Sequence, residues 1–226
     1  MQTILEPWAP NLVTFWDEFI KSIIETIQMF SLSGIISFVL GLLLGVIFVI
    51  TKPNGITPNR LINTTIDVFV NVFRSIPFII LIAFMIPVTR MIAGTSIGVK
   101  GAIFPLVLGC VPFFTRQIDL ALSSIDPGLI EAAKAMGVSN LGIIFRIYLP
   151  ESIPAIARST TITAISLLGL TAMGGAVGAG GIGSFVLRYG YQRYYNDIMI
   201  VCILLILFFV LIIQLIGDIV IEKTTH

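Results

Sequence analysis

The sequence predicts an all-α integral membrane protein with five transmembrane helices in a single domain spanning residues 1–226. Hydrophobic residues make up 57% of the chain and charged residues only 11%. The mean hydropathy is +1.05, so a lipid bilayer is the expected solvent. The formal net charge of +1 gives no reason to expect a nucleic acid as partner.

Uninterrupted apolar runs locate the five spans. Three runs without charged residues are long enough to cross about 30 Å of hydrocarbon at about 1.5 Å per residue. They are Thr26–Thr51, Ser159–Leu187 and Ile198–Gly217. Ser75–Thr89 and Gly101–Thr115 are shorter, so we expect the first to extend back to Leu61 and the second to continue to about Leu122.

Small residues inside the spans have a packing interpretation. Gly41 and Gly45 have the spacing G-x-x-x-G, which favours close contact between membrane helices. Cys110 and Cys202 both lie in apolar runs, where a cysteine usually packs as a small side chain. The sequence therefore predicts no disulfide framework.

Residues 123–150 interrupt the apolar pattern and predict a polar helical hairpin. Asp126 is placed to cap a first helix that has Pro127 in its opening turn. Gly137 supplies the left-handed residue that ends this helix, and Ser139 is placed to cap the next one. Pro150 either closes the second helix or opens the one that follows.

A water-exposed hairpin in an otherwise hydrophobic chain is typical of a docking surface, although an ordinary amphipathic surface loop is the alternative. Its first helix offers small residues for close backbone approach, apolar residues for a contact face and charged residues that fix register at the rim. The small residues are Ala132 and Ala133, the apolar residues are Leu129, Ile130 and Met136, and the charged residues are Glu131 and Lys134.

Arg74 lies within the second predicted span. An arginine inside a membrane helix costs at least about 2.5 kcal/mol on insertion scales, so it should face a cavity, a partner or the cytoplasmic end. Asp67 lies two helical turns earlier and could share a polar environment with it. Arg74 is then either part of a translocation path or a structural arginine that bonds carbonyls freed by Pro77.

Residues Thr171–Phe185 form a glycine-rich stretch, TAMGGAVGAGGIGSF. Gly178, Gly180 and Gly183 have the spacing G-x-G-x-x-G, but no strand or βαβ unit flanks them, so a dinucleotide site is rejected. Glycines at this density instead let a membrane helix pack closely, break, or open into a loop.

The hairpin resembles the cytoplasmic signature of ATP-binding-cassette (ABC) importer permeases, in which E-A-A is followed by a glycine and later by I-x-L-P. The matching residues are Glu131, Ala132, Ala133, Gly137, Ile147, Leu149 and Pro150. The resemblance implies a type I ABC importer permease fold, in which this loop is a coupling helix that sits in a groove of a separate ATPase subunit.

Further blocks are similar to the methionine-importer branch of that family. They are FRSIPFI at 73–79, IPVTR at 86–90, GTSIG at 94–98 and AMGGAVGAGGIG at 172–183. The resemblance runs from roughly the first span to Asp218. It implies a homodimer with two ATPase copies and a methionine-binding lipoprotein or periplasmic protein, and transport by alternating access. Candidate pathway or gate residues are Arg74, Met173, Gly174 and Gly175, with plain helix-to-loop packing as the alternative for the last three.

The resemblance also implies location and topology: a bacterial plasma (inner) membrane protein with the coupling loop and C-terminus in the cytoplasm and the N-terminus outside. Lys and Arg residues have only a weak bias in the same sense. The chain contains no G-x-x-x-x-G-K-[ST] motif, so we expect no enzyme activity, with ATP and Mg bound by the ATPase partner. We expect no cofactor and no metal site, and His226, the only histidine, to be inert.

Other functions stay open at this point. The chain could be a permease for another amino acid or small nutrient, which has the same architecture. A secondary transporter or channel acting alone would normally show an inverted repeat or several buried ionisable residues, and neither is evident. A membrane enzyme would need a catalytic motif such as H-E-x-x-H, which the sequence lacks.

Overall fold

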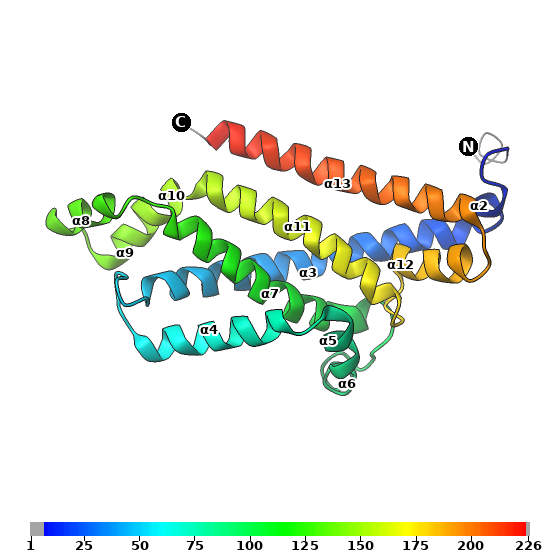
Figure 1. Ribbon diagram of the computed structural model, residues 1–226, viewed down its shortest axis with the longest axis horizontal. Helices are drawn as coiled ribbons and strands as arrows, with labels where there is room; N and C mark the ends of the chain where they lie inside the picture. Colours follow the sequence, from blue (N-terminus) through cyan, green and yellow to red (C-terminus); the bar gives the residue numbers. More distant parts are fainter. Residues whose placement is uncertain (1–6, 225–226) are drawn as a thin grey trace. The chain divides into compact units, whose positions relative to one another are not determined.

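The computed structural model describes residues 7–224, which form helices and turns without any strand (Figure 1). His226 lies outside the described residues. The helices are α2 (Pro10–Thr14), α3 (Trp16–Ile50), α4 (Arg60–Ser75), α5 (Phe78–Phe84), α6 (Ile86–Ala93), α7 (Gly98–Ser123), α8 (Pro127–Ala135), α9 (Asn140–Ile143), α10 (Leu149–Glu151), α11 (Ile153–Gly175), α12 (Gly181–Phe185) and α13 (Asn196–Thr224). Two π-helical segments, η1 (Ile144–Tyr148) and η2 (Val186–Tyr191), follow α9 and α12 directly.

Within residues 7–224, four helices are long and apolar enough to cross a membrane: α3, α7, α11 and α13. A fifth span exists only if α4 and α5 are counted together, since the chain breaks between them at Ile76 and Pro77. Proline fixes its own backbone and disfavours helix at the preceding residue, which explains the break. The second predicted span is therefore not one continuous helix.

The fourth predicted span, Ser159–Leu187, is also wrong in extent. Helix α11 ends at Gly175, and a turn over residues 176–180 leads into α12. Gly178, Gly180 and Gly181 make this turn with positive φ values. Gly183 of α12 then approaches α11 so closely that a Cβ would overlap the carbonyl oxygen of Ala172. The segment predicted as a continuous helix folds back on itself.

The chain divides into two compact units, which we describe separately. The first unit comprises the chain up to Ile36, Ile76–Gly109 and Ile165–Ile213. Its core joins α2 and the first turns of α3 to α12, η2 and the start of α13, with Leu12, Phe19, Phe185 and Ile198 buried. Asp197 holds α2 to α13, because its carboxylate accepts hydrogen bonds from the backbone and side-chain nitrogens of Asn11 at 2.9 and 3.1 Å.

The second unit comprises Ser37–Ser75, Cys110–Ala164 and Gln214–His226. Here the later part of α3 packs closely on α7. A Cβ on Gly41 would lie 2.7 Å from the ring of Phe114, and one on Gly45 would lie 2.5 Å from Ile118. The predicted packing role of this glycine pair is confirmed.

The described helices expose much apolar surface. On α13, which has only 11% of its span window buried, the outward residues include Leu204, Leu207, Phe208 and Leu211. Such a surface is suited to lipid or to another apolar partner rather than to water. Cys110 and Cys202 are free and buried, as the sequence predicts.

Candidate functional site

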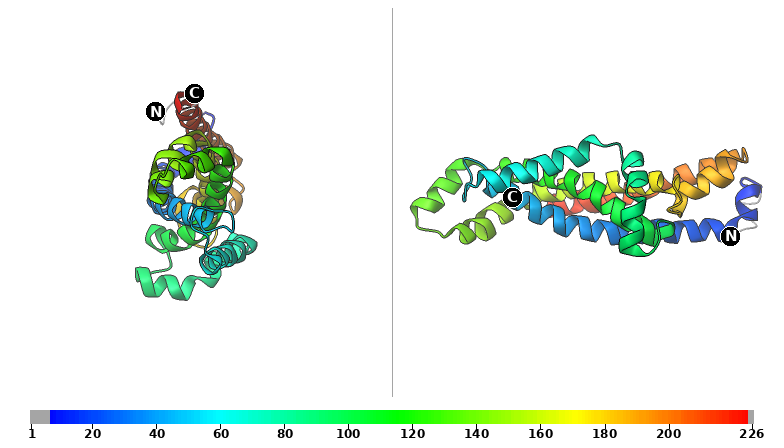
Figure 2. Two further views of the ribbon diagram at one scale, coloured as in Figure 1. Left: turned by 90° about the vertical axis from the view of Figure 1, so that its left-hand side faces the viewer. Right: turned by 90° about the horizontal axis from the view of Figure 1, so that it is seen from below.

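The predicted hairpin consists of α8, α9 and η1 (Figure 2). The starts of α8 and α9 are capped as expected. Asp126 accepts a hydrogen bond from the backbone N–H of Gly128 at 2.8 Å, and Ser139 accepts one from Gly142 at 3.2 Å. Gly137 has φ +77°, a conformation that favours glycine. Pro150 lies in α10, which continues η1 without a break and ends at Glu151, before α11 begins at Ile153.

One face of the hairpin is buried within its own unit. Ile130 and Ala133 of α8 pack with Ile143 and Ile144 and with Ile56 of the turn between α3 and α4. Of the residues expected to form the contact surface, Ile130 and Ala133 are therefore packed into the core of the hairpin. Their spacing of three residues puts them on the same side of the helix, and that side closes the hairpin core.

The hairpin also exposes large apolar side chains. Met136 is 75% exposed, Leu141 67%, Phe145 65% and Leu129 45%. A shallow hollow beside the turn and the second arm is lined by Met136, Val138, Leu141, Phe145 and Arg146. The sequence pattern identifies Leu129 and Met136 but misses Leu141 and Phe145, although their spacing of four residues puts these two on one side of the second arm.

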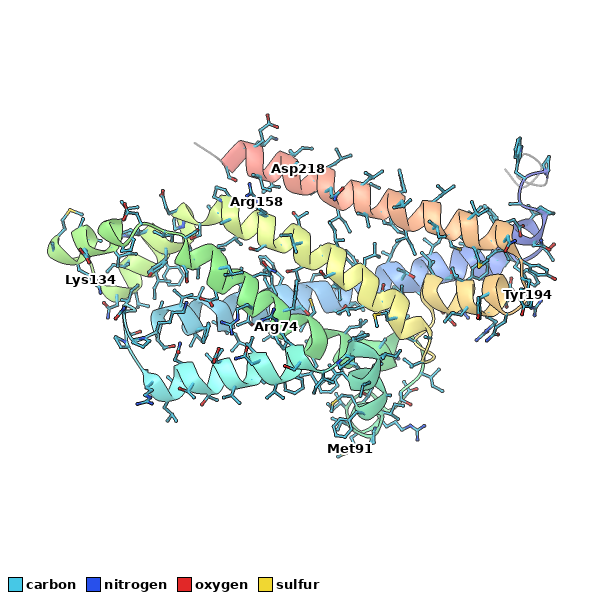
Figure 3. The ribbon with its side chains drawn as sticks, in the orientation of Figure 1. Arg74, Met91, Lys134, Arg158, Tyr194 and Asp218 are labelled. Atoms are coloured by element: carbon cyan, nitrogen blue, oxygen red, sulfur yellow. The ribbon has the colours of Figure 1, made fainter. Side chains whose placement is uncertain are left out.

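The other predicted hairpin residues divide by exposure. Glu131, Ala132 and Pro150 are exposed, whereas Ile147 and Leu149 are half-buried and pack against the hairpin core. Lys134 is exposed on the hairpin (Figure 3). The signature thus combines outward residues with residues that hold the hairpin together. Burial raises the pKa of the neighbouring Tyr148 phenol, which stays neutral.

Arg74 and Asp67 do not form the shared environment that their spacing predicts. Arg74 is exposed in the last turn of α4, and its guanidinium forms no hydrogen bond or ion pair within residues 7–224 (Figure 3). The carboxylate of Asp67 instead pairs with Arg116 of α7 at 2.8 Å. The two residues lie about 700° apart around an α-helix and so near the same face. Asp67 nevertheless pairs with a residue of another helix rather than with Arg74.

The glycine-rich stretch forms a tight turn between α11 and α12. Gly178, Gly180 and Gly181 all have positive φ values. Gly174 is buried against Ala179, and a Cβ on Gly175 would overlap the backbone of Ser184. Met173, one residue earlier, is 42% exposed. Its neighbouring glycines therefore permit close packing in this structure.

Side chains from α3 hold this turn in place. Glu25 accepts a hydrogen bond from the backbone N–H of Gly181 at 2.8 Å, and the hydroxyl of Thr26 accepts one from Ile182 at 2.8 Å. The backbone N–H of Gly98 also donates to the carbonyl of Gly178 at 2.9 Å. Sequence reasoning misses Glu25 and Thr26, and no local signal links residues 156 positions apart.

A second group that the sequence analysis misses lies where α7 approaches the hairpin. Arg116 and Asp119 of α7 interact with Asp67 of α4 and with Lys52, which follows α3. The signal available was an arginine followed three residues later by an aspartate in an extended span. Such a pair faces one side of a helix and needs partners in an apolar setting.

Comparison with known proteins identifies the family. Residues 37–226 match the model of the binding-protein-dependent transport system inner membrane component. The chain belongs to this family. Its members are membrane components of transporters, so the chain is a non-catalytic membrane subunit rather than an enzyme.

Individual relatives agree with the methionine branch. The probable D-methionine transport system permease protein MetI of Vibrio cholerae is 43% identical over 202 residues, covering 89% of this chain and 90% of the relative. The methionine import system permease protein MetP of Bacillus subtilis is 43% identical over 171 residues, covering 76% and 77% of the two chains.

A solved structure agrees as well. A permease chain in inward-facing conformations of the MetNI methionine ABC transporter superposes with a TM-score of 0.91 at 43% identity. It covers 94% of this chain and 99% of that one. The predicted resemblance to methionine-importer permeases and the predicted all-α membrane fold are confirmed.

Proposed function

We propose that this chain is the membrane-spanning permease subunit of an ATP-driven importer that carries methionine across the bacterial inner membrane. The observation that carries the proposal is the likeness to methionine permeases over nearly the whole chain. The exposed apolar face of the hairpin supports it, because a permease without an ATP-binding motif needs a surface for a separate ATPase.

The proposed assembly contains two copies of this chain, two ATPase subunits that bind ATP and Mg, and a methionine-binding lipoprotein or periplasmic protein. The chain itself binds no cofactor. The hairpin and the C-terminus face the cytoplasm and the N-terminus lies outside. The whole chain, residues 1–226, acts as one transmembrane domain, and lipid covers its outer apolar surface.

The hairpin is the proposed site of coupling to the ATPase. Glu131, Ala132 and Pro150 lie on its exposed surface, together with Met136, Leu141 and Phe145. An apolar centre with a charged rim is the arrangement that gives both affinity and a fixed register. Ala133, Ile147 and Leu149 act indirectly, since they hold the hairpin arms together, and Gly137 sets the turn between them.

Transport then proceeds by alternating access. Closure of the two ATPases draws the paired hairpins together and tilts the membrane helices so that the pathway opens outward. Methionine delivered by the binding protein enters, and ATP hydrolysis restores the inward-facing state. We assign Arg74 to the pathway, and Met173, Gly174 and Gly175 to the outer closure. The pathway need not bind methionine tightly, since a strong intermediate site would slow release.

Uptake of radiolabelled L-methionine tests the proposal. The chain is co-expressed with its ATPase and binding protein in cells that lack other methionine importers. We expect uptake that requires this chain and disappears with a catalytically dead ATPase. Excess unlabelled methionine should abolish it, and other amino acids should not. A complex that hydrolyses ATP but takes up a different amino acid would retain the permease role and reject methionine as the substrate.

Substitutions in the hairpin test the coupling role. Replacing Glu131 or Gly137 with a bulky residue should reduce ATPase association or stimulation while the chain remains in the membrane. For Gly137 the reason is backbone strain, because no atom lies within 4 Å of the added Cβ but φ is positive. The coupling role would be wrong if both variants retained normal association and stimulation.

A further inference from the structure

A compact charged network joins three elements of the second unit. The Arg116 guanidinium donates to Asp67 at 2.8 Å, to Asn71 at 3.1 Å and to Asp119 at 3.1 Å. The Lys52 ammonium donates to Asp119 and, at 3.1 Å, to the hydroxyl of Ser123. Two cations and two carboxylates thereby connect the end of α3, the face of α4 and the last turns of α7.

The network has a buried half and an exposed half. Asp119 is only 5% exposed and is held by Lys52, Arg116 and Ser123. The cations also lie over the ring of Phe48, at 5.5 Å for Lys52 and 5.2 Å for Arg116. A buried carboxylate with this many partners is costly to uncover, so this half is a fixed anchor.

The contact with α4 is different in kind. The Asp67 side chain is 42% exposed, and Asn71 is exposed as well. The Asp67 carboxylate is less enclosed by the protein than that of Asp119, so its pair with Arg116 can separate at a lower cost. Arg116 can therefore release α4 and still keep its bond to Asp119, so separation of α4 from α7 leaves no buried charge without a partner.

The hairpin acts on this network from two directions. Helix α7 ends at Ser123, and α8 begins at Pro127, so movement of the hairpin reaches the Asp119 end of α7 first. Ile56, in the turn after Lys52, packs directly against Ile130 and Ala133 of the hairpin. Both routes converge on the residues that bind Asp119.

We propose that Arg116 is a positioning residue that transmits displacement of the hairpin to α4 through its exposed pair with Asp67, while Asp119 and Lys52 anchor it. This inference rests on the proposed function, because it assigns a coupling step within an ATP-driven importer. The pair with Asp67 is made and broken during the cycle, and the pair with Asp119 persists.

The test measures methionine taken up per ATP hydrolysed by the complete importer in proteoliposomes. Asp67→Asn should leave assembly intact and lower this ratio by about two- to fivefold, the range that one exposed ion pair supplies. Asp67→Glu should restore most of it. Glu222→Gln, which neutralises an exposed carboxylate at the end of α13, is the matched control and should not change the ratio.

Asp119→Asn serves as the structural contrast and should reduce the yield of folded complex. A wild-type ratio in Asp67→Asn would overturn the inference, because the pair would then have no role in coupling. Loss of assembly in that variant would also overturn it, because the pair would then be purely structural. If the wild-type complex itself hydrolyses ATP without methionine uptake, the proposed function fails instead, and the two failures are distinct.

Discussion

The hairpin at residues 123–150 and the glycine-rich turn at residues 171–185 use glycine and apolar side chains in opposite ways. The hairpin encloses a small core and leaves Met136, Leu141 and Phe145 facing outward. The glycine-rich turn leaves few large side chains outside and brings backbone against backbone at Gly175 and Gly183. The hairpin therefore has an apolar surface that no other part of the described chain covers, whereas the glycine-rich turn is packed against its own chain.

This difference separates two uses of glycine that look alike in a sequence. Gly137 has open space around its Cβ position and is required only for its backbone conformation. Gly183 has an ordinary helical conformation and is required only because there is no space. Dense glycines do not by themselves indicate mobility, because here they permit contacts that fix the turn.

The largest expected effect comes from disrupting the close packing of the glycine-rich turn. Gly183→Ala places a methyl group against the carbonyl of Ala172, and backbone cannot move aside as a side chain would. We expect a loss of about 3 kcal/mol or more, seen as a fall of roughly 6–12 °C in the thermal midpoint in detergent. Gly169→Ala is the matched control, because its Cβ has no neighbour within 4 Å, and it should keep the wild-type midpoint.

The next effect concerns the side chains that hold the turn. Thr26→Val keeps the shape of the side chain but removes the buried acceptor for the Ile182 N–H, at a cost of about 1–3 kcal/mol. Thr65→Val, on the exposed face of α4, should change the thermal midpoint little. Equal midpoints for the two variants would mean that Thr26 does not stabilise the turn.

A weaker effect tests the open surface. Met136→Asp places a charge in the exposed apolar patch and should raise the dissociation constant for the ATPase about tenfold, or about 1.4 kcal/mol. Folding should be unaffected, since the side chain is 75% exposed. Met91→Asp, at an exposed methionine on α6, is the control for binding. Equal loss of affinity in both would contradict a contact specific to the hairpin.

The smallest effect concerns Met173, which borders the glycine-rich turn. Met173→Ala should preserve assembly and alter uptake, or uptake per ATP hydrolysed, by about two- to fourfold, a small effect because the side chain is 42% exposed and loses only part of its apolar burial. The hypothesis is that this flexible side chain completes the outer closure. Unchanged uptake together with an unchanged ATPase rate would remove Met173 from the gate.

Local chemistry made much of the fold predictable. Apolar runs locate α3, α7 and α13, and the Asp126, Gly137 and Ser139 signals give the hairpin its caps and turn. The two errors in the spans have one cause. At Pro77 and at Gly175 the chain breaks inside a hydrophobic run, and hydropathy has no means of detecting such a break.

The site was predicted where its determinants are close in sequence and missed where they are distant. The hairpin signature lies within 20 residues, but the bond between Thr26 and Ile182 and the pair between Asp67 and Arg116 depend on how helices meet. Asp67 and Arg74 share a helical face, yet that face says nothing of which neighbour supplies the counterion. Such choices are made by packing.

The burial of both cysteines has a practical consequence for labelling. Cys110 and Cys202 are 2% and 0% exposed, and a thiol needs access as well as ionisation to react. A new cysteine at an exposed position, such as Met136, should therefore be the preferred target of a maleimide reagent in the natural background. Fluorescent or spin-label reporters of hairpin movement could then be attached without first removing the native thiols.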